Sequence, residues 1–265
     1  MTTLKRFVVV CVAVSLLTVP AFAQPGNPGN GDLDQVQQQD GTCDNVAREC
    51  DGTGAQQRGR GRGRGWGRRA AWRAAQGDRL NQQVLDMGTL TQDEVDEVLY
   101  MRQEEKLARD VYITLSETWL ADVFDTIAAS EQRHMDAIGR IVEAQDLEDP
   151  IVDNTVGAFS DEFFAGLYAD LTTAGEASYV EALKTGAYIE ELDIADLMMA
   201  LEIAENDYLT QVLGNLQRGS RNHLRAFVSR LAAEGETYIP QVLSAEQFEE
   251  IISSSVERGG RQGRQ

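Results

Sequence analysis

This chain of 265 residues holds two histidines, and each lies in the middle of a long helical pattern among carboxylates. His134 follows Glu131 by three residues, so both side chains share one face of a helix. His223 lies in another such pattern. Two further patterns carry paired glutamates near mid-length: Glu104 with Glu105, and Glu190 with Glu191. Glutamate and histidine that converge from four helices at one level are how a helical bundle holds a carboxylate-bridged pair of metal ions.

A buried hydrogen-bonded network without metal is the alternative explanation. Each uncompensated buried carboxylate would cost several kcal/mol, and the apolar faces carry no Lys or Arg as an obvious counter-ion, since Arg109 and Arg133 lie beside their stripes. A divalent cation would offset the repulsion directly, so the pattern favours metal binding. Carboxylate and imidazole ligands suit iron first, as one or two ions, with manganese or zinc as alternatives.

The elements that must position these residues are all predicted to be helical. Between residues 74 and 239 the chain has one proline, Pro150, no alternating strand pattern, and long apolar periods near 3.6. Thr91 to Glu94 forms a capping box before the first long helix. The midpoints of the four long helices share one level, which places the glutamates and histidines in one layer. The predicted helices span residues 92–118, 122–145, 161–172, 177–203, 207–233 and 245–254.

Connection lengths predict how these helices pack. Short turns follow the helices at 92–118 and 177–203, so each of these helices should form an antiparallel hairpin with the next long one. Residues 146–176 join the two hairpins and are long enough to cross the whole bundle. The expected fold is therefore an all-α, ferritin-like four-helix bundle over residues 74–254, with a short helix in the long crossover and a short C-terminal helix.

The N-terminal residues predict export. Lys5 and Arg6 precede a short apolar stretch, and Ala21-Phe22-Ala23 is a small-x-small cleavage site, so residues 1–23 are expected to be a signal peptide. An uncleaved anchor is the alternative. No other stretch has the length and apolar character to span a membrane. The mature protein is expected to be periplasmic or extracellular.

Low-complexity segments flank the predicted helices. Residues 24–73 are predicted to be a disordered linker rich in Gly and Arg, and residues 255–265 a disordered tail. Cys43 and Cys50 would form a disulfide in an oxidising compartment, with a soft-metal pair as the less favoured alternative. The Arg-Gly run at 58–65 could contact an anionic partner or serve only as a solubilising linker. A net charge of −19 disfavours nucleic acid as a partner of the acidic body.

Several stretches within these helices match patterns known from other proteins. Glu105-Lys106-Leu107-Ala108-Arg109-Asp110-Val111-Tyr112 is similar to the first-helix pattern of rubrerythrins, E-x-x-A-R-x-x-Y. Ser130-Glu131-Gln132-Arg133-His134 resembles their second-helix E-x-x-H. More closely, residues 90–254 resemble the ferritin-like family labelled domain of unknown function 2202. The stretches that carry this resemblance are 104–112, 130–137, 189–197 and 219–227.

The rubrerythrin resemblance implies a set of metal ligands: Glu105, Glu131, His134, Glu190 and His223. It prefers Glu105, whereas periodicity leans slightly toward Glu104. Two positions depart from the pattern, because Ser220 stands where a glutamate belongs and Ala187 where a ligand is expected. A rubredoxin-like module with four cysteines is also missing. A full set of carboxylates would therefore need help from further candidates, namely Glu104, Glu191 or Asp193.

Two functions from different classes follow. The first is an exported oxidoreductase, a di-iron or di-manganese oxidase or peroxidase that acts on peroxide, oxygen or Fe(II). Tyr112 or Tyr188 would then donate hydrogen bonds to the ligands. The second is a non-catalytic bundle that a metal ion stabilises and that binds partners through its surface or its Arg-Gly segment. A metal-free scaffold is a third alternative, and the sequence does not predict an oligomeric state.

Overall fold

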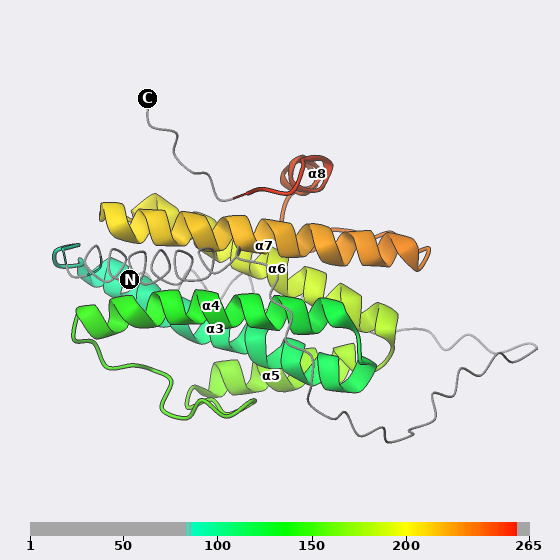
Figure 1. The fold of residues 1–265 in the computed structure, drawn as a ribbon, viewed down its shortest axis with the longest axis horizontal. Helices are drawn as coiled ribbons and strands as arrows, with labels where there is room; N and C mark the ends of the chain where they lie inside the picture. The colour runs from blue at the N-terminus through cyan, green and yellow to red at the C-terminus, as the bar shows by residue number, and fades with distance from the viewer. Residues whose placement is uncertain (1–83, 85, 259–265) are drawn as a thin grey trace, which may run out of the picture.

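The computed structural model describes residue 84 and residues 86–258, and this part of the chain forms six helices and no strands (Figure 1). The all-α prediction is thereby confirmed. Each helix that the sequence predicts over this range is present, with ends that differ by a few residues. The helices are α3 (Gln92–Trp119), α4 (Asp122–Ala144), α5 (Glu162–Gly175), α6 (Tyr179–Ile203), α7 (Asp207–Ala233) and α8 (Ala245–Ser253).

Several predicted segments lie outside the described residues. They are the signal peptide at 1–23, the linker at 24–73 with Cys43 and Cys50, and residues 259–265 of the tail. Of the helices that the structure describes, none is long and apolar enough to cross a membrane.

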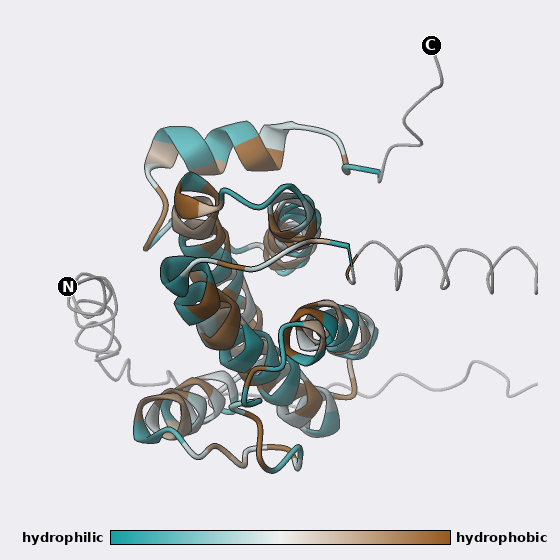
Figure 2. Ribbon diagram, turned by 90° about the vertical axis from the view of Figure 1, so that its left-hand side faces the viewer, coloured by the Kyte–Doolittle hydropathy of each residue, from teal (hydrophilic) through white to brown (hydrophobic). Residues whose placement is uncertain are grey.

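The long helices pack as two hairpins side by side. α3 lies against α4 and α6 against α7, while α3 also contacts α6 and α4 contacts α7. The crossover helix α5 packs across α3 and α6, and α8 lies against α7 on the opposite side of the molecule (Figure 1, Figure 2). Short connections between hairpin partners and one long connection between hairpins produce this order, as the loop lengths predicted.

Glu94 joins the two hairpins at one end. Its Oε2 accepts the backbone N–H of Thr91 at 2.9 Å, and Thr91 Oγ1 accepts the N–H of Glu94 at 3.3 Å, which completes the predicted capping box. Its Oε1 accepts the backbone N–H groups of Glu205 at 2.9 Å and Asn206 at 2.8 Å, in the turn between α6 and α7. One carboxylate therefore caps the N-terminus of α3 and also fixes the turn between α6 and α7 against it, which aligns the two hairpins.

Two apolar clusters divide the core along its length. One cluster includes Leu107 on α3 and Leu224 on α7, together with residues further along both helices. The other ends at Met101 on α3 and at Leu216 on α7. The residues between these positions form a polar layer across the middle of the long helices. This layer is the level at which the sequence predicts the glutamates and histidines to meet.

Three buried charged residues on α3 fix the crossover segment. Lys106 and Arg109 both pair with Asp110, and the exposed fractions of the three residues are 1%, 4% and 0%. Lys106 Nζ also donates to the carbonyl oxygen of Thr155 at 2.9 Å, and Asp110 Oδ2 accepts the N–H of Gly157 at 3.0 Å. Arg109, which the sequence places beside the apolar stripe of its helix, therefore pairs with Asp110 and with the crossover segment.

Part of the predicted disordered tail lies against α7. Glu257 accepts bidentate hydrogen bonds from Arg221 at 2.7 and 2.6 Å and a further one from Arg225 at 2.9 Å. These bonds, above all those from Arg221, hold the pKa of Glu257 at about 2 against the opposing effect of burial. The chain after α8 is thus fastened as far as residue 257, beside the part of α7 that carries His223.

We expect Asp110→Asn to lower the free energy of unfolding by about 3–5 kcal/mol, because it leaves the buried Lys106 ammonium without its carboxylate. Urea denaturation followed by helical circular dichroism measures the change. Asp136→Asn is the matched control, because Asp136 is exposed and accepts only from Gln132 on its own helix. Equal losses in the two variants would contradict the role given to Asp110.

Candidate metal centre

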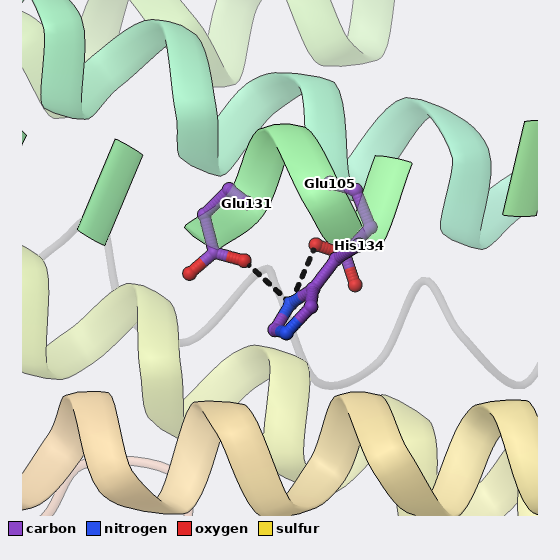
Figure 3. Close-up of side chains that lie close together, drawn as sticks. All are labelled: Glu105, Glu131 and His134. Atoms are coloured by element: carbon purple, nitrogen blue, oxygen red, sulfur yellow. Dashed lines mark ion pairs between the residues drawn. The ribbon is translucent and has the colours of Figure 1, made fainter. Parts of the chain in front are cut away.

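Five residues from four helices meet in the polar layer. Glu105 comes from α3, Glu131 and His134 from α4, Glu190 from α6 and His223 from α7. They form two groups whose ligand atoms lie within 4.8 Å of one another and could hold a metal ion: Glu105, Glu131 and His134, and Glu131, Glu190 and His223. Glu131 belongs to both groups. Figure 3 shows the first group, in which both carboxylates approach the imidazole of His134.

The two oxygens of Glu131 are divided between the two histidines. Oε2 lies 2.7 Å from Nδ1 of His134, and Oε1 lies 2.7 Å from Nδ1 of His223. A terminal carboxylate completes each group, because Glu105 lies 3.3 Å from Nδ1 of His134 and Glu190 lies 3.4 Å from Nδ1 of His223. The imidazole rings stack with centroids 5.6 Å apart. The result is a pseudo-symmetric pair of three-residue groups that share one carboxylate.

Several ligand atoms in this layer are buried without a hydrogen-bond partner in the described part of the chain. They are Nδ1 of His134 and of His223, Oε1 of Glu105 and of Glu131, and Oδ1 of Asp193. Glu131 contacts both histidines at the short distance of 2.7 Å as an ion pair. Buried polar atoms are almost always satisfied in folded proteins. Nitrogen and oxygen atoms that face one volume in this way fit a cation placed between them.

Burial and mutual repulsion dominate the electrostatics of the layer. Burial raises the pKa of Glu105 well above its usual value, and burial followed by the charges of Glu190 and Glu131 raises the pKa of Asp193 to about 8. Burial alone would lower the pKa of His223, but Glu131 and Glu190 raise it to about 10. Within residues 86–258, the ion pairs of Glu105, Glu131 and Glu190 are all with histidine. A cation would displace protons from this layer and neutralise the same charges.

Tyr112 supports one of the carboxylates. Its hydroxyl donates to Oε1 of Glu190 at 2.6 Å, and its ring is fully buried. For the second predicted tyrosine, Tyr188, burial and then the charge of Glu191 raise the pKa. One end of the centre therefore has a phenol that orients a terminal carboxylate.

Glu191 has a role that sequence reasoning missed. Its carboxylate accepts hydrogen bonds from the hydroxyl of Tyr238 at 2.6 Å and from the backbone N–H groups of Gln241, Val242 and Leu243 at 3.0, 2.9 and 2.9 Å. These donors lie 47 to 52 residues further along the chain, so no local pattern predicts them. The structure therefore assigns Glu191 to the segment after α7 rather than to the metal groups.

Glu104 belongs to neither metal group, although its Oε2 is buried without a hydrogen-bond partner in the described part of the chain. It lines a small hollow between α3, α5 and α6 together with Tyr100 and Asp196. Burial, followed by the charges of Asp196 and Asp193, raises the pKa of Glu104 well above its usual value. Glu105, which the rubrerythrin resemblance preferred, is the member of this pair that the structure brings to the histidines.

Gly219 makes room for His134. A Cβ atom at residue 219 would lie 2.6 Å from both Cε1 and Nε2 of the imidazole, far inside van der Waals contact. The backbone of α7 can therefore approach the ring only where the side chain is a hydrogen atom. A glycine next to Ser220, in the middle of a helix, is the sequence signal that could have identified this close approach.

The fold and the site define an all-α protein whose buried carboxylates and imidazoles could hold a metal ion. The chain belongs to the family described as uncharacterized protein domain (DUF2202), whose pattern matches residues 94–255. That range contains every ligand candidate described above.

An uncharacterized protein of the archaeon Methanocaldococcus jannaschii, MJ0754, is 48% identical over 170 residues, which is 64% of this chain and 92% of the relative. The crystal structure of hypothetical protein MJ0754 from Methanococcus jannaschii DSM 2661 superposes with a TM-score of 0.63 at 46% identity. It covers 64% of this chain and 97% of that one.

The neighbours Glu190 and Glu191 should separate metal binding from stability. We expect Glu190→Gln to weaken metal binding by at least about ten-fold, because it removes charge from one terminal ligand. Glu191→Gln should leave metal affinity unchanged and lower the free energy of unfolding by about 1–3 kcal/mol, because an amide cannot accept all the bonds that Glu191 accepts. Metal titration and urea denaturation of both variants measure this. A loss of affinity in Glu191→Gln would show that the assignment is wrong.

Gly219→Ala tests the close approach of α7 to His134. The added methyl group should push the imidazole away and weaken metal binding roughly ten-fold, while helix propensity rises by up to about 1 kcal/mol. Gly214→Ala on the same helix is the matched control, because a Cβ at residue 214 meets nothing within 4 Å. Metal titration should distinguish the two variants. Equal affinities would mean that the position of His134 does not limit binding.

Proposed function

We propose that this protein is a ferritin-like metalloprotein in which the polar layer binds redox-active divalent cations, iron in the first place. The observation that carries the proposal is the division of the Glu131 oxygens between His134 and His223, with a terminal glutamate at each histidine. A carboxylate bridge between two nitrogen–oxygen sites is how helical bundles hold a metal pair. The two hairpins and their long crossover support the same class of fold.

The donor atoms favour iron or manganese. The layer supplies carboxylate oxygens and imidazole nitrogens, and the chain has no cysteine beyond residue 50 that could add a thiolate to this domain. Hard and intermediate donors of this kind suit iron and manganese, and zinc also accepts them. We place iron first because a redox-active ion would allow the site with the buried, shared carboxylate to carry out oxidation chemistry.

We propose oxidase or peroxidase chemistry on oxygen, peroxide or Fe(II) for this site. Bound iron would supply the one-electron chemistry toward dioxygen or peroxide that the side chains of the layer lack. The residues of the chain would hold and orient the ligands of the ion. Tyr112 fixes Glu190 by its hydrogen bond, and the apolar clusters on both sides of the layer limit the access of water. The histidine side chains keep 12% of their surface exposed, so the layer is not completely closed to solvent.

A non-catalytic metal site is the second candidate function. The departures at Ser220 and Ala187 favour it, because they leave fewer carboxylates than an oxygen-activating pair of ions commonly has. The ion would then replace protons in the layer and stabilise the fold. Tight binding of a redox-silent ion, with loss of helicity on chelation, would distinguish this function from the first.

We also propose that the protein acts outside the cytoplasm. Support comes from the signal-like residues 1–23 and from Cys43 and Cys50, whose pairing an oxidising compartment would favour. The Arg-Gly segment would provide a contact with an anionic partner there. Cleavage at Ala23 in the exported protein, detected by mass of the mature chain, tests this location.

The metal proposal predicts a specific composition and response. We expect the full chain, purified without added metal, to contain iron at about one to two ions per chain and to consume oxygen when Fe(II) is added. Glu131→Ala should lose most of the bound metal because both groups share this residue, and His134→Ala should lose about half. Elemental analysis and oxygen consumption measure these outcomes.

A metal-free protein would overturn this proposal, above all if Glu131→Ala were as stable as the parent or more stable. In that case the layer would be a hydrogen-bonded network held by protons. A single zinc ion without oxygen consumption would favour the non-catalytic function instead.

A further inference from the structure

A fourth carboxylate lies beside the two metal groups. Asp193 follows Glu190 by three residues, so both side chains share one face of α6. Its exposed fraction is 5%. Its Oδ2 accepts a hydrogen bond from Oγ of Ser220 on α7, whereas its Oδ1 has no hydrogen-bond partner among residues 86–258 and is fully buried. One oxygen of Asp193 is therefore held in place and the other is free for a ligand.

Ser220 fixes the position of Asp193. The hydroxyl is fully buried and lies within hydrogen-bond distance of two oxygens, Oδ2 of Asp193 and the carbonyl oxygen of Leu216 at 3.0 Å. These contacts leave Ser220 little freedom to turn. The serine thus stands at the position where the sequence pattern leads one to expect a carboxylate, and it holds a carboxylate that comes from the neighbouring helix.

Asp193 interacts with both metal groups. The charges of Glu190, of Glu131 and of His134 all act on its carboxyl group, and its own charge acts on Glu105. Of the other two extra candidates, Glu191 is engaged by residues 238–243, and Glu104 lines the hollow beside Asp196. Of the further candidates, Asp193 is therefore the one that shares a helix face with a member of a metal group and is affected by the charges of both groups.

The charge of the layer decides how many cations it suits. Once cations displace the protons of the layer, Glu105, Glu131 and Glu190 would together carry three negative charges, and neutral histidines would add none. Two divalent cations would leave this set with an excess positive charge, which is costly to bury. With Asp193 ionised, the carboxylates balance two divalent cations. One divalent cation would instead leave a buried negative excess that only protons could remove.

We propose that the centre holds two divalent cations and that Asp193, positioned by Ser220, supplies the fourth carboxylate ligand. The proposal rests on the metal-binding function above and specifies its stoichiometry and its ligands. The carboxylate that a Glu-x-x-His motif would place on α7 comes here from α6, as a Glu-x-x-Asp pair at Glu190 and Asp193. Both oxygens of Asp193 then have a partner, Ser220 on one side and a cation on the other.

Equilibrium dialysis of the full chain against Fe(II) without oxygen tests the proposal, with iron per chain measured by elemental analysis. We expect about two ions in the parent and about one in Asp193→Asn. Ser220→Ala keeps the charge and should still bind two ions, the second about ten-fold more weakly. Asp196→Asn is the matched control on the same helix, since Asp196 accepts from Tyr100 at 3.2 Å beside the hollow. It should bind two ions as the parent does.

Each result is decisive for one of the two proposals. Two ions of unchanged affinity in Asp193→Asn, or one ion in the parent, would overturn the role of Asp193 and leave the metal-binding function standing. No iron in the parent would overturn the metal-binding function itself. Circular dichroism checks that the helices are intact, and Ser220→Ala keeps the test valid if Asp193→Asn does not fold.

Discussion

The burial of several carboxylates in one layer, with imidazoles as their only ionic partners there, is the constraint on which the rest of the structure depends. Glu105, Glu131 and Glu190 are each about 1% exposed and form ion pairs only with His134 and His223 within the described chain. Lone buried charges are strongly unfavourable, so this layer requires protons or cations. The basic residues nearest in sequence, Lys106 and Arg109, are already engaged by Asp110 and the crossover.

The helices, their order and the level of the layer were predictable from the sequence because they follow from local patterns. Apolar periodicity, the capping box at Thr91 and the lengths of the connections depend on residues close together in the chain. Glu131 and His134 were identifiable for the same reason, since three residues of separation put them on one face. Periodicity alone could not make the choice within each glutamate pair, because neighbours on a helix differ by about 100° in direction and distant partners decide between them; the resemblance to rubrerythrins indicated Glu105 and Glu190. Glu191 accepts hydrogen bonds from the segment between Tyr238 and Leu243, and Glu104 lines the hollow beside Asp196.

The family match places the centre in the shared part of the chain. Residues 94–255 contain all four long helices almost completely, along with α5 and α8. The archaeal relative aligns over 92% of its own length, but over 64% of this chain. The residues that predict export and the Arg-Gly segment precede the family match. The residues before the match differ in composition from the helical domain, and the two parts can be studied as separate questions.

The C-terminal segment is fastened to the same two helices that carry Glu190 and His223. Glu191 holds residues 238–243 and adjoins Glu190 in sequence, while Arg221 and Arg225, which hold Glu257, flank His223. The anchors of this segment thus lie next to candidate metal ligands on both α6 and α7. Release of the segment would free both helices on their outer faces, and a tightly held centre would in turn keep the segment docked, because linkage is reciprocal. If the two are linked in this way, the resistance of the C-terminal residues to proteases and to amide exchange would report on the state of the buried layer.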